Sequence, residues 1–218
     1  MKEIGNIYLT WRKGIGYSRI PIGVVRRNVT YGVRFQYVEP EVKKAQKDGF
    51  TYYPDFPDIS KEYTENVLDI IGKRLVNPER SDIQKYYDFW EINPAYKDDK
   101  YYLLAHTQGM LATDNFEFLA DYNPIKGLSF ISEICGLSHT KIEANFIQVD
   151  EELAWKFDKN NEFDSKAIQI FKEDRYLGNV KLIHCGVFHK NGGADLKIKV
   201  KSIEQNGSLS RVFIQIAF

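Results

Sequence analysis

Residues 158–170 read DKNNEFDSKAIQI and are the most informative segment about how this chain folds. Its first half is rich in Asn and Asp, whose side chains bond to nearby backbone groups and favour turns. Its second half runs into the apolar segment 167–171, which predicts a strand. A polar turn that leads directly into a strand indicates β-structure in this part of the chain. From the residues alone, the turn either buries Phe163 in the core or presents its ring to a ligand.

Segments on both sides of this stretch extend the pattern. Apolar and β-branched runs predict strands over 128–134, 144–149, 196–203 and 212–218, together with a helix over 179–189. Upstream, the polar run Asp121-Tyr122-Asn123-Pro124 ends in a proline and predicts a boundary. We therefore expect two domains, 1–123 and 124–218.

The front half predicts a mixed sheet with helices. Strands are expected over 7–11, 20–25, 31–38 and 115–119, with Pro40 ending the third of them. Helices are expected over 60–75 with Ser60 as N-cap, from Ser81 onward, and over 102–107. The expected fold class is α+β, with an N-terminal module of mixed sheet and helices followed by a β-rich half.

Composition excludes several classes of protein. The 218 residues contain 30 basic and 30 acidic side chains and are 43% hydrophobic, which argues against a disordered chain and against a polycation that coats nucleic acid. The small basic excess lies in residues 181–218, with six basic residues against two acidic ones. With only two cysteines, no membrane-length apolar run and no apolar stretch at the start, we expect a cytoplasmic protein that does not enter a membrane.

Residues 158–170, followed by Tyr176-Leu177-Gly178-Asn179-Val180, resemble the central signature of the HIRAN domain. In that family Asn-Pro-Tyr-Asp, two further residues, Ala-Ile and an apolar residue precede a Gly-His turn into a helix. The chain differs at Glu162, which replaces the proline, and at Asn179, which replaces the histidine. The resemblance implies a small β-barrel with one or two short helices over 124–218. HIRAN domains fused to DNA-repair helicases capture a single-stranded 3′ end, and others are stand-alone bacterial proteins.

The resemblance also implies a set of site residues. Phe163 would stack on a base, Asp164 would accept a hydrogen bond from the 3′-hydroxyl, and Asn161 would line the same pocket. Asn179 and Lys181 would lie near the phosphates. The helicase-linked members have Arg-Tyr-Tyr upstream, and this chain has Ser138, His139 and Thr140 at those positions.

Lys197, Lys199 and Lys201 alternate with apolar residues and share one face of a predicted strand. They would either contact phosphates or guard a solvated sheet face against edge pairing. His184, Cys185 and His189 are close in sequence, but zinc needs four ligands and no second pair accompanies them, so we expect neither metal nor cofactor. Since no nucleophile elbow, cysteine signature or phosphate-binding loop is present, we expect no enzyme activity.

The front half is similar to the N-terminal subdomain of HipA-type toxin kinases, which also occurs as a separate antitoxin. The similarity covers 7–11, 22–25, 34–37, 66–75 and 105–118. The stretch 109–117, GMLATDNFE, is similar to one that recurs in stand-alone bacterial HIRAN proteins. No kinase lobe follows.

Two functions follow from the sequence. The first is a non-catalytic protein that recognises single-stranded DNA or a DNA 3′ end. The second is an antitoxin-like or regulatory subunit that binds a protein partner, such as a kinase or a helicase, through an exposed loop with Tyr52, Tyr53 and Phe56. The Asn-x-Phe-Asp match favours the first function, and the missing arginine and tyrosines favour the second.

Overall fold

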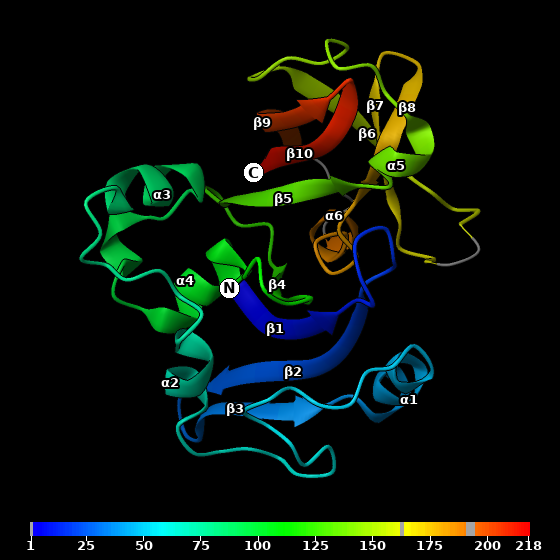
Figure 1. Ribbon diagram of the computed structural model, residues 1–218. Helices are drawn as coiled ribbons and strands as arrows, with labels where there is room; N and C mark the ends of the chain where they lie inside the picture. Colours follow the sequence, from blue (N-terminus) through cyan, green and yellow to red (C-terminus); the bar gives the residue numbers. More distant parts are fainter. Residues whose placement is uncertain (1, 162–163, 191–194) are drawn as a thin grey trace. The chain divides into compact units, whose positions relative to one another are not determined.

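The computed structural model describes residues 2–161, 164–190 and 195–218 (Figure 1). It divides into two compact units, one made of Ile4–Asp121 and the other of Tyr122–Phe218 with the residues before Ile4. The first contains a four-stranded sheet with helices, and the second contains a closed six-stranded barrel. The predicted α+β class is confirmed. None of the described helices is long and apolar enough to cross a membrane.

The sheet of the first unit has the strand order β3-β2-β1-β4. Its strands are β1 (Ile4–Trp11), β2 (Ile20–Asn28), β3 (Gly32–Tyr37) and β4 (Phe116–Tyr122). Its helices are α1 (Glu39–Lys47), α2 (Val67–Gly72), α3 (Ile83–Phe89) and α4 (Lys100–Thr107), with a short 3-10 turn, η1, at Pro94–Tyr96. The four strands predicted in this half are confirmed, with ends that differ by a few residues.

The core of this unit is a cluster of aromatic side chains beside β3. The rings of Phe35 and Phe56 stack with their centroids 4.5 Å apart, and both are fully buried. The Tyr37 hydroxyl donates to the Phe56 carbonyl over 2.6 Å and accepts from the Tyr53 amide over 2.8 Å. The prediction that Tyr53 and Phe56 lie exposed on a docking loop is therefore wrong. Only Tyr52 of that trio is exposed.

The predicted helix over 60–75 forms only from Val67 to Gly72. Ser60 is not its N-cap, because the Ser60 amide and hydroxyl both bond to Asp58 in a local turn. Tyr63 forms an isolated β-bridge with Phe35, in which each amide donates to the other's carbonyl. This pairing satisfies the backbone amide and carbonyl of Tyr63 outside a helix.

Helix α1 is missing from the sequence-based prediction. The sequence pattern predicts Pro40 only as the end of a strand, but Pro40 lies in the first turn of α1, where a proline has no amide bond to lose. Glu39 and Glu41 lie in the first turn, and Lys44 and Lys47 in the last, which complements the helix dipole.

The stretch 109–117 has a structural role. Arg74, which is 8% exposed, donates to both carboxylate oxygens of Asp114 at 2.7 and 2.9 Å, and to the Gly109 carbonyl at 2.6 Å. Glu117 accepts two bonds of 3.0 Å from Arg19. Gly109 has a φ of +51°, and a Cβ there would lie 2.9 Å from Leu104. These contacts fix the path of the chain into β4.

The barrel has the closed strand order β10-β5-β8-β7-β6-β9. Its strands are β5 (Ser129–Cys135), β6 (Glu152–Phe157), β7 (Ile168–Lys172), β8 (Arg175–Val180), β9 (Lys197–Asn206) and β10 (Ser208–Ala217). Two helices of four residues each, α5 (Leu137–Thr140) and α6 (Gly186–His189), complete it. The predicted strands near 128–134, 167–171, 196–203 and 212–218 are confirmed.

Two expectations for the barrel are wrong, and one strand is missing from the prediction. Residues 144–149 form an irregular loop instead of a strand, residues 179–189 are not one helix, and β6 was not predicted. The chain stays in β8 through Val180 and becomes helical only at Gly186. Gly178 allows the chain to remain in β8 at this point. Its φ is +153°, and a Cβ there would lie 2.3 Å from the Cys135 carbonyl oxygen. Only glycine allows β8 to approach β5 this closely.

Candidate functional site

The outer face of β6, β7 and β8 brings rings, amides and a cation together. Strand pairing sets Ala154 opposite Phe171, and Phe171 opposite Tyr176. The next outward row contains Lys156, Gln169 and Asn179. Successive side chains of a strand point to opposite faces, so these residues share the side away from the buried Ile168 and Ile170. We call these five polar and aromatic residues, Lys156, Gln169, Phe171, Tyr176 and Asn179, the outer-face cluster.

The two rings of the cluster come from a hairpin with a two-residue turn. Lys172 pairs with Arg175, and Phe171 with Tyr176, across Glu173 and Asp174. The ring centroids are 5.7 Å apart, and both side chains are half-buried. The Lys156 ammonium lies 4.0 Å from the Phe171 centroid. Half-buried rings beside a cation form a surface on which a planar group can stack.

Asn179 is a half-buried member of the cluster. Its amide group interacts with the Tyr176 hydroxyl, while its Oδ1 is buried and has no hydrogen-bond partner among the residues that the structure describes. Burial raises the pKa of Tyr176, and the negative charge of Asp158 raises it further. The hydroxyl therefore stays protonated at neutral pH. A buried acceptor without a donor is costly unless water or a ligand supplies one.

The loop after β6 reaches the cluster through Asp158. Asn161 donates to Asp158 Oδ2 over 2.9 Å, and its own Oδ1 accepts from the Asp164 amide over 2.9 Å. Asp164 Oδ1 accepts from the Lys166 amide, which leaves Oδ2 without a partner among the described residues. The structure therefore brings Asn161 and Asp164 together, but largely through bonds that shape the loop. Phe163, the predicted stacking residue, lies outside the described residues.

Helix α5 lies beside β8. The Thr140 hydroxyl donates to the Leu177 carbonyl over 3.0 Å, and β5, which leads into α5, sets Cys135 opposite Asn179. Ser138 and His139 are exposed on this short helix. The predicted residues Ser138, His139 and Thr140 are therefore near Asn179 along the same edge, as Figure 1 shows for α5 and β8.

Lys181 lies apart from this cluster, in the interior. It is fully buried, and its Nζ is 3.1 Å from Glu133 Oε2. Arg211 donates to the other oxygen of Glu133 over 3.2 Å. The expectation that Lys181 faces phosphates does not fit this placement, since an ammonium enclosed with a carboxylate is not offered to a ligand.

Lys197 and Lys199 are exposed on β9, the neighbour of β6. Lys199 lies directly opposite Glu152. Both lysines therefore lie on the outer side of the barrel, one strand beyond Lys156, and the carboxylate of Glu152 offsets part of their charge. They extend the outer face without belonging to the ring cluster.

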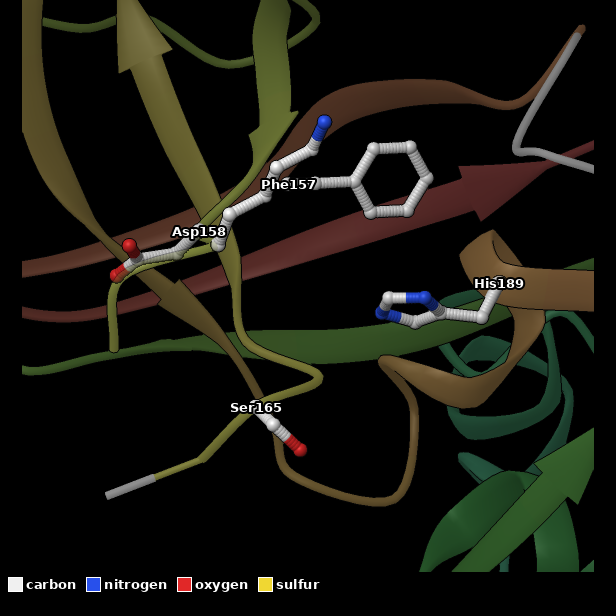
Figure 2. Close-up of a pocket in the computed structure, with 5 residues that line it drawn as sticks. Phe157, Asp158, Ser165 and His189 are labelled. Atoms are coloured by element: carbon white, nitrogen blue, oxygen red, sulfur yellow. The ribbon is translucent and has the colours of Figure 1, made fainter. Parts of the chain in front are cut away.

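An open depression of about 390 Å³ lies beside the same loop. Its lining residues are Phe157, Asp158, Lys159, Ser165 and His189. Figure 2 shows the Phe157 ring directed toward His189, and their centroids are 4.8 Å apart. The Asp158 carboxylate points the opposite way in this view. His189 Nε2 bonds to the Lys166 carbonyl at 3.0 Å, which ties α6 to the loop.

The remaining candidates for chemistry are enclosed. Cys185 is fully buried, and burial raises the pKa of its thiol to about 12, so the reactive thiolate is scarce at neutral pH. His184 is buried beside Ser132, with Nδ1 and Oγ 2.8 Å apart. Within the described ranges, no group of three or more His, Cys, Asp or Glu side chains is placed to hold a metal ion.

No protein-family model and no curated protein matches the chain. Among solved structures, the HIRAN domain of human HLTF is similar, with 18% identity and a TM-score of 0.33 over 40% of this chain and 74% of that one. A protein from Lactobacillus plantarum is similar with 14% identity and a TM-score of 0.33, over 43% of this chain and 96% of that one. These likenesses are too weak to bear on function, and the similarity of the front half to HipA-type kinases stays a prediction.

Proposed function

We propose that the barrel is a non-catalytic module that binds single-stranded DNA, with a preference for a free 3′ end. The observation that supports this most is the outer-face cluster, where a half-buried ring pair adjoins the buried Oδ1 of Asn179, an acceptor without a partner among the described residues. Bases stack on aromatic rings, and their amino groups supply the donors that a buried acceptor requires. The sequence resemblance of residues 158–180 to HIRAN domains points to the same class of ligand.

Each residue has a distinct role in this proposal. When a strand binds, the Lys156 ammonium moves from the face of the Phe171 ring to a backbone phosphate. A base then stacks on the ring. Tyr176 presents the second ring, and Asn179 accepts a hydrogen bond from the base. Asp164 Oδ2 accepts from the 3′-hydroxyl and repels a 3′-phosphate.

The zero net charge of the chain favours binding that is local over coating of long strands. The alternative is docking of a protein partner on the Tyr52–Phe56 loop. Two of the three rings proposed for that contact, Tyr53 and Phe56, are buried in the core. No observation in the structure favours that alternative, and a protein partner stays a prediction.

Replacement of either ring should weaken binding of a short labelled strand. We expect Phe171→Leu and Tyr176→Leu to weaken it about tenfold each, because a stacked base contributes ~1–3 kcal/mol and leucine keeps the apolar volume without the ring. The measurement is fluorescence anisotropy in low salt. Tyr52→Leu, which changes a 48% exposed ring in the other unit, is the matched control.

The end preference is tested with the same strand carrying a 3′-phosphate. Wild type should bind the blocked strand less tightly, and Asp164→Asn should reduce the difference between the two strands. Equal affinity for both strands in the wild type would disprove end recognition. Failure to bind any strand in low salt would disprove the proposed function.

A further inference from the structure

The sheet unit contains a second, separate concentration of cationic side chains. A depression of about 370 Å³ is lined by Asn6, Arg26, Arg27, Asn28, Arg34 and Glu62. Strand pairing brings two of these arginines together: β2 and β3 pair Arg26 directly with Arg34, so both project from the same face. Asn6, on β1, precedes the Ile7–Val25 pair and so lies beside Arg26.

Two opposed arginines repel each other unless a negative charge compensates for each of them. Directly opposed residues of an antiparallel pair have Cβ atoms about 5 Å apart, and like charges there are destabilising. Arg34 is compensated by Glu62, 3.3 Å away. Arg27 is compensated by Asp99, 2.6 Å away. Arg26 contacts only the neutral amide of Gln36, at 3.4 Å, and has no carboxylate partner among the described residues.

The hairpin that joins the two strands adds an exposed ring. Tyr31 is 65% exposed, and the Arg34 guanidinium lies 4.6 Å from its centroid. Arginine, asparagine and an exposed tyrosine are the donors and the stacking surface that a single nucleic-acid strand uses. An acidic peptide would pair with the arginines but has no need for the ring.

We propose that this surface, formed by Asn6, Arg26, Tyr31 and Arg34, is a second contact site for single-stranded nucleic acid. Arg26 and Arg34 bind backbone phosphates, and Tyr31 stacks on a base. The inference rests on the proposed function, because it assumes that the chain binds a single strand. It assigns to the sheet unit a sequence-independent share of the affinity, separate from end recognition by the barrel.

The test is the salt dependence of binding by the full chain. For single strands the slope of log K against log salt is about −0.7 per neutralised phosphate, so Arg26→Gln with Arg34→Gln should make the slope shallower by about 1.4. Tyr31→Leu should weaken binding about tenfold without changing the slope. The ratio of affinities for 3′-hydroxyl and 3′-phosphate strands should stay as in the wild type.

Matched controls come from the same unit. Arg80→Gln removes an exposed arginine that pairs with Asp82, and Tyr17→Leu removes a ring that is 56% exposed. If the wild type binds single strands and the double arginine variant shows the same salt slope, this inference alone is overturned. Absence of binding by the wild type would overturn the proposed function with it. A third outcome is that the double arginine variant loses binding to a poly-glutamate peptide and still binds DNA as the wild type does. That result would assign the surface to an acidic protein partner and also overturn the inference.

Discussion

Glu133→Gln should destabilise the barrel by about 3–5 kcal/mol, because it leaves the ammonium of Lys181 buried without its carboxylate. Lys181 is fully buried and lies 3.1 Å from Glu133. Desolvation of a charge costs several kcal/mol unless an opposite charge compensates for it. Hydrogen exchange in urea, followed by mass spectrometry, measures the free energy of unfolding for peptides of each unit separately.

The matched control is Glu143→Gln. Glu143 pairs with Arg175 over 3.0 Å, a similar distance, but its side chain is 68% exposed, so the loss should be below about 1 kcal/mol. Adding Lys181→Met to Glu133→Gln should recover much of the stability, since no charge then remains buried at that position. Equal effects of Glu133→Gln and Glu143→Gln would mean that Lys181 is hydrated.

The same variants decide whether Lys181 contacts DNA. If its role is structural, the Glu133→Gln Lys181→Met protein should bind a labelled strand as the wild type does once it is folded. Lys181 lies two residues after the Gly-Asn pair of the HIRAN-like signature, and this position predicts a phosphate contact. It cannot show that the side chain turns inward, because its partner Glu133 comes from a different strand.

Strands were predictable where β-branched and aromatic residues are dense, as in β2, β3, β9 and β10. The prediction failed where contacts between segments distant in the sequence determine the secondary structure. Residues 60–65 have helical spacing, but Tyr63 instead pairs with Phe35. Gly178 and Asn179 are poor strand formers, yet the close approach of β8 to β5 requires the glycine.

The site was located only in part. The motif led to Asn179, whose amide group interacts with the Tyr176 hydroxyl, and to Asn161 and Asp164, which bond to each other in the loop after β6. Phe171 and Tyr176 themselves were missed, although the sequence contains a usable pattern. In Phe171-Lys172-Glu173-Asp174-Arg175-Tyr176, a two-residue polar turn sets basic residues opposite each other and then two rings. The bulge beyond them, which fixes the outward direction of Asn179, depends on pairing that no local pattern specifies.

Asp114→Ala should destabilise the sheet unit by about 3 kcal/mol or more. Arg74 is 8% exposed, and Asp114 is the carboxylate that accepts from both of its terminal nitrogens. Asp114 Oδ1 also accepts from the Phe116 amide over 3.0 Å, at the start of β4. Removal of the carboxylate leaves a buried guanidinium without its counter-charge and an amide without its acceptor.

Asp82→Ala is the control, because Arg80 also donates to both oxygens of Asp82, at 2.8 Å each, but the two side chains are 55% and 52% exposed. The same bidentate geometry in solvent should contribute below about 1 kcal/mol. Urea unfolding followed by hydrogen exchange measures both variants on peptides of the sheet unit. If Asp114→Ala costs no more than Asp82→Ala, the stretch 109–117 does not hold β4 in place. If the expected difference appears, the stretch 109–117 has a structural role in this unit, separate from the binding roles proposed for the outer-face cluster and the arginines of β2 and β3.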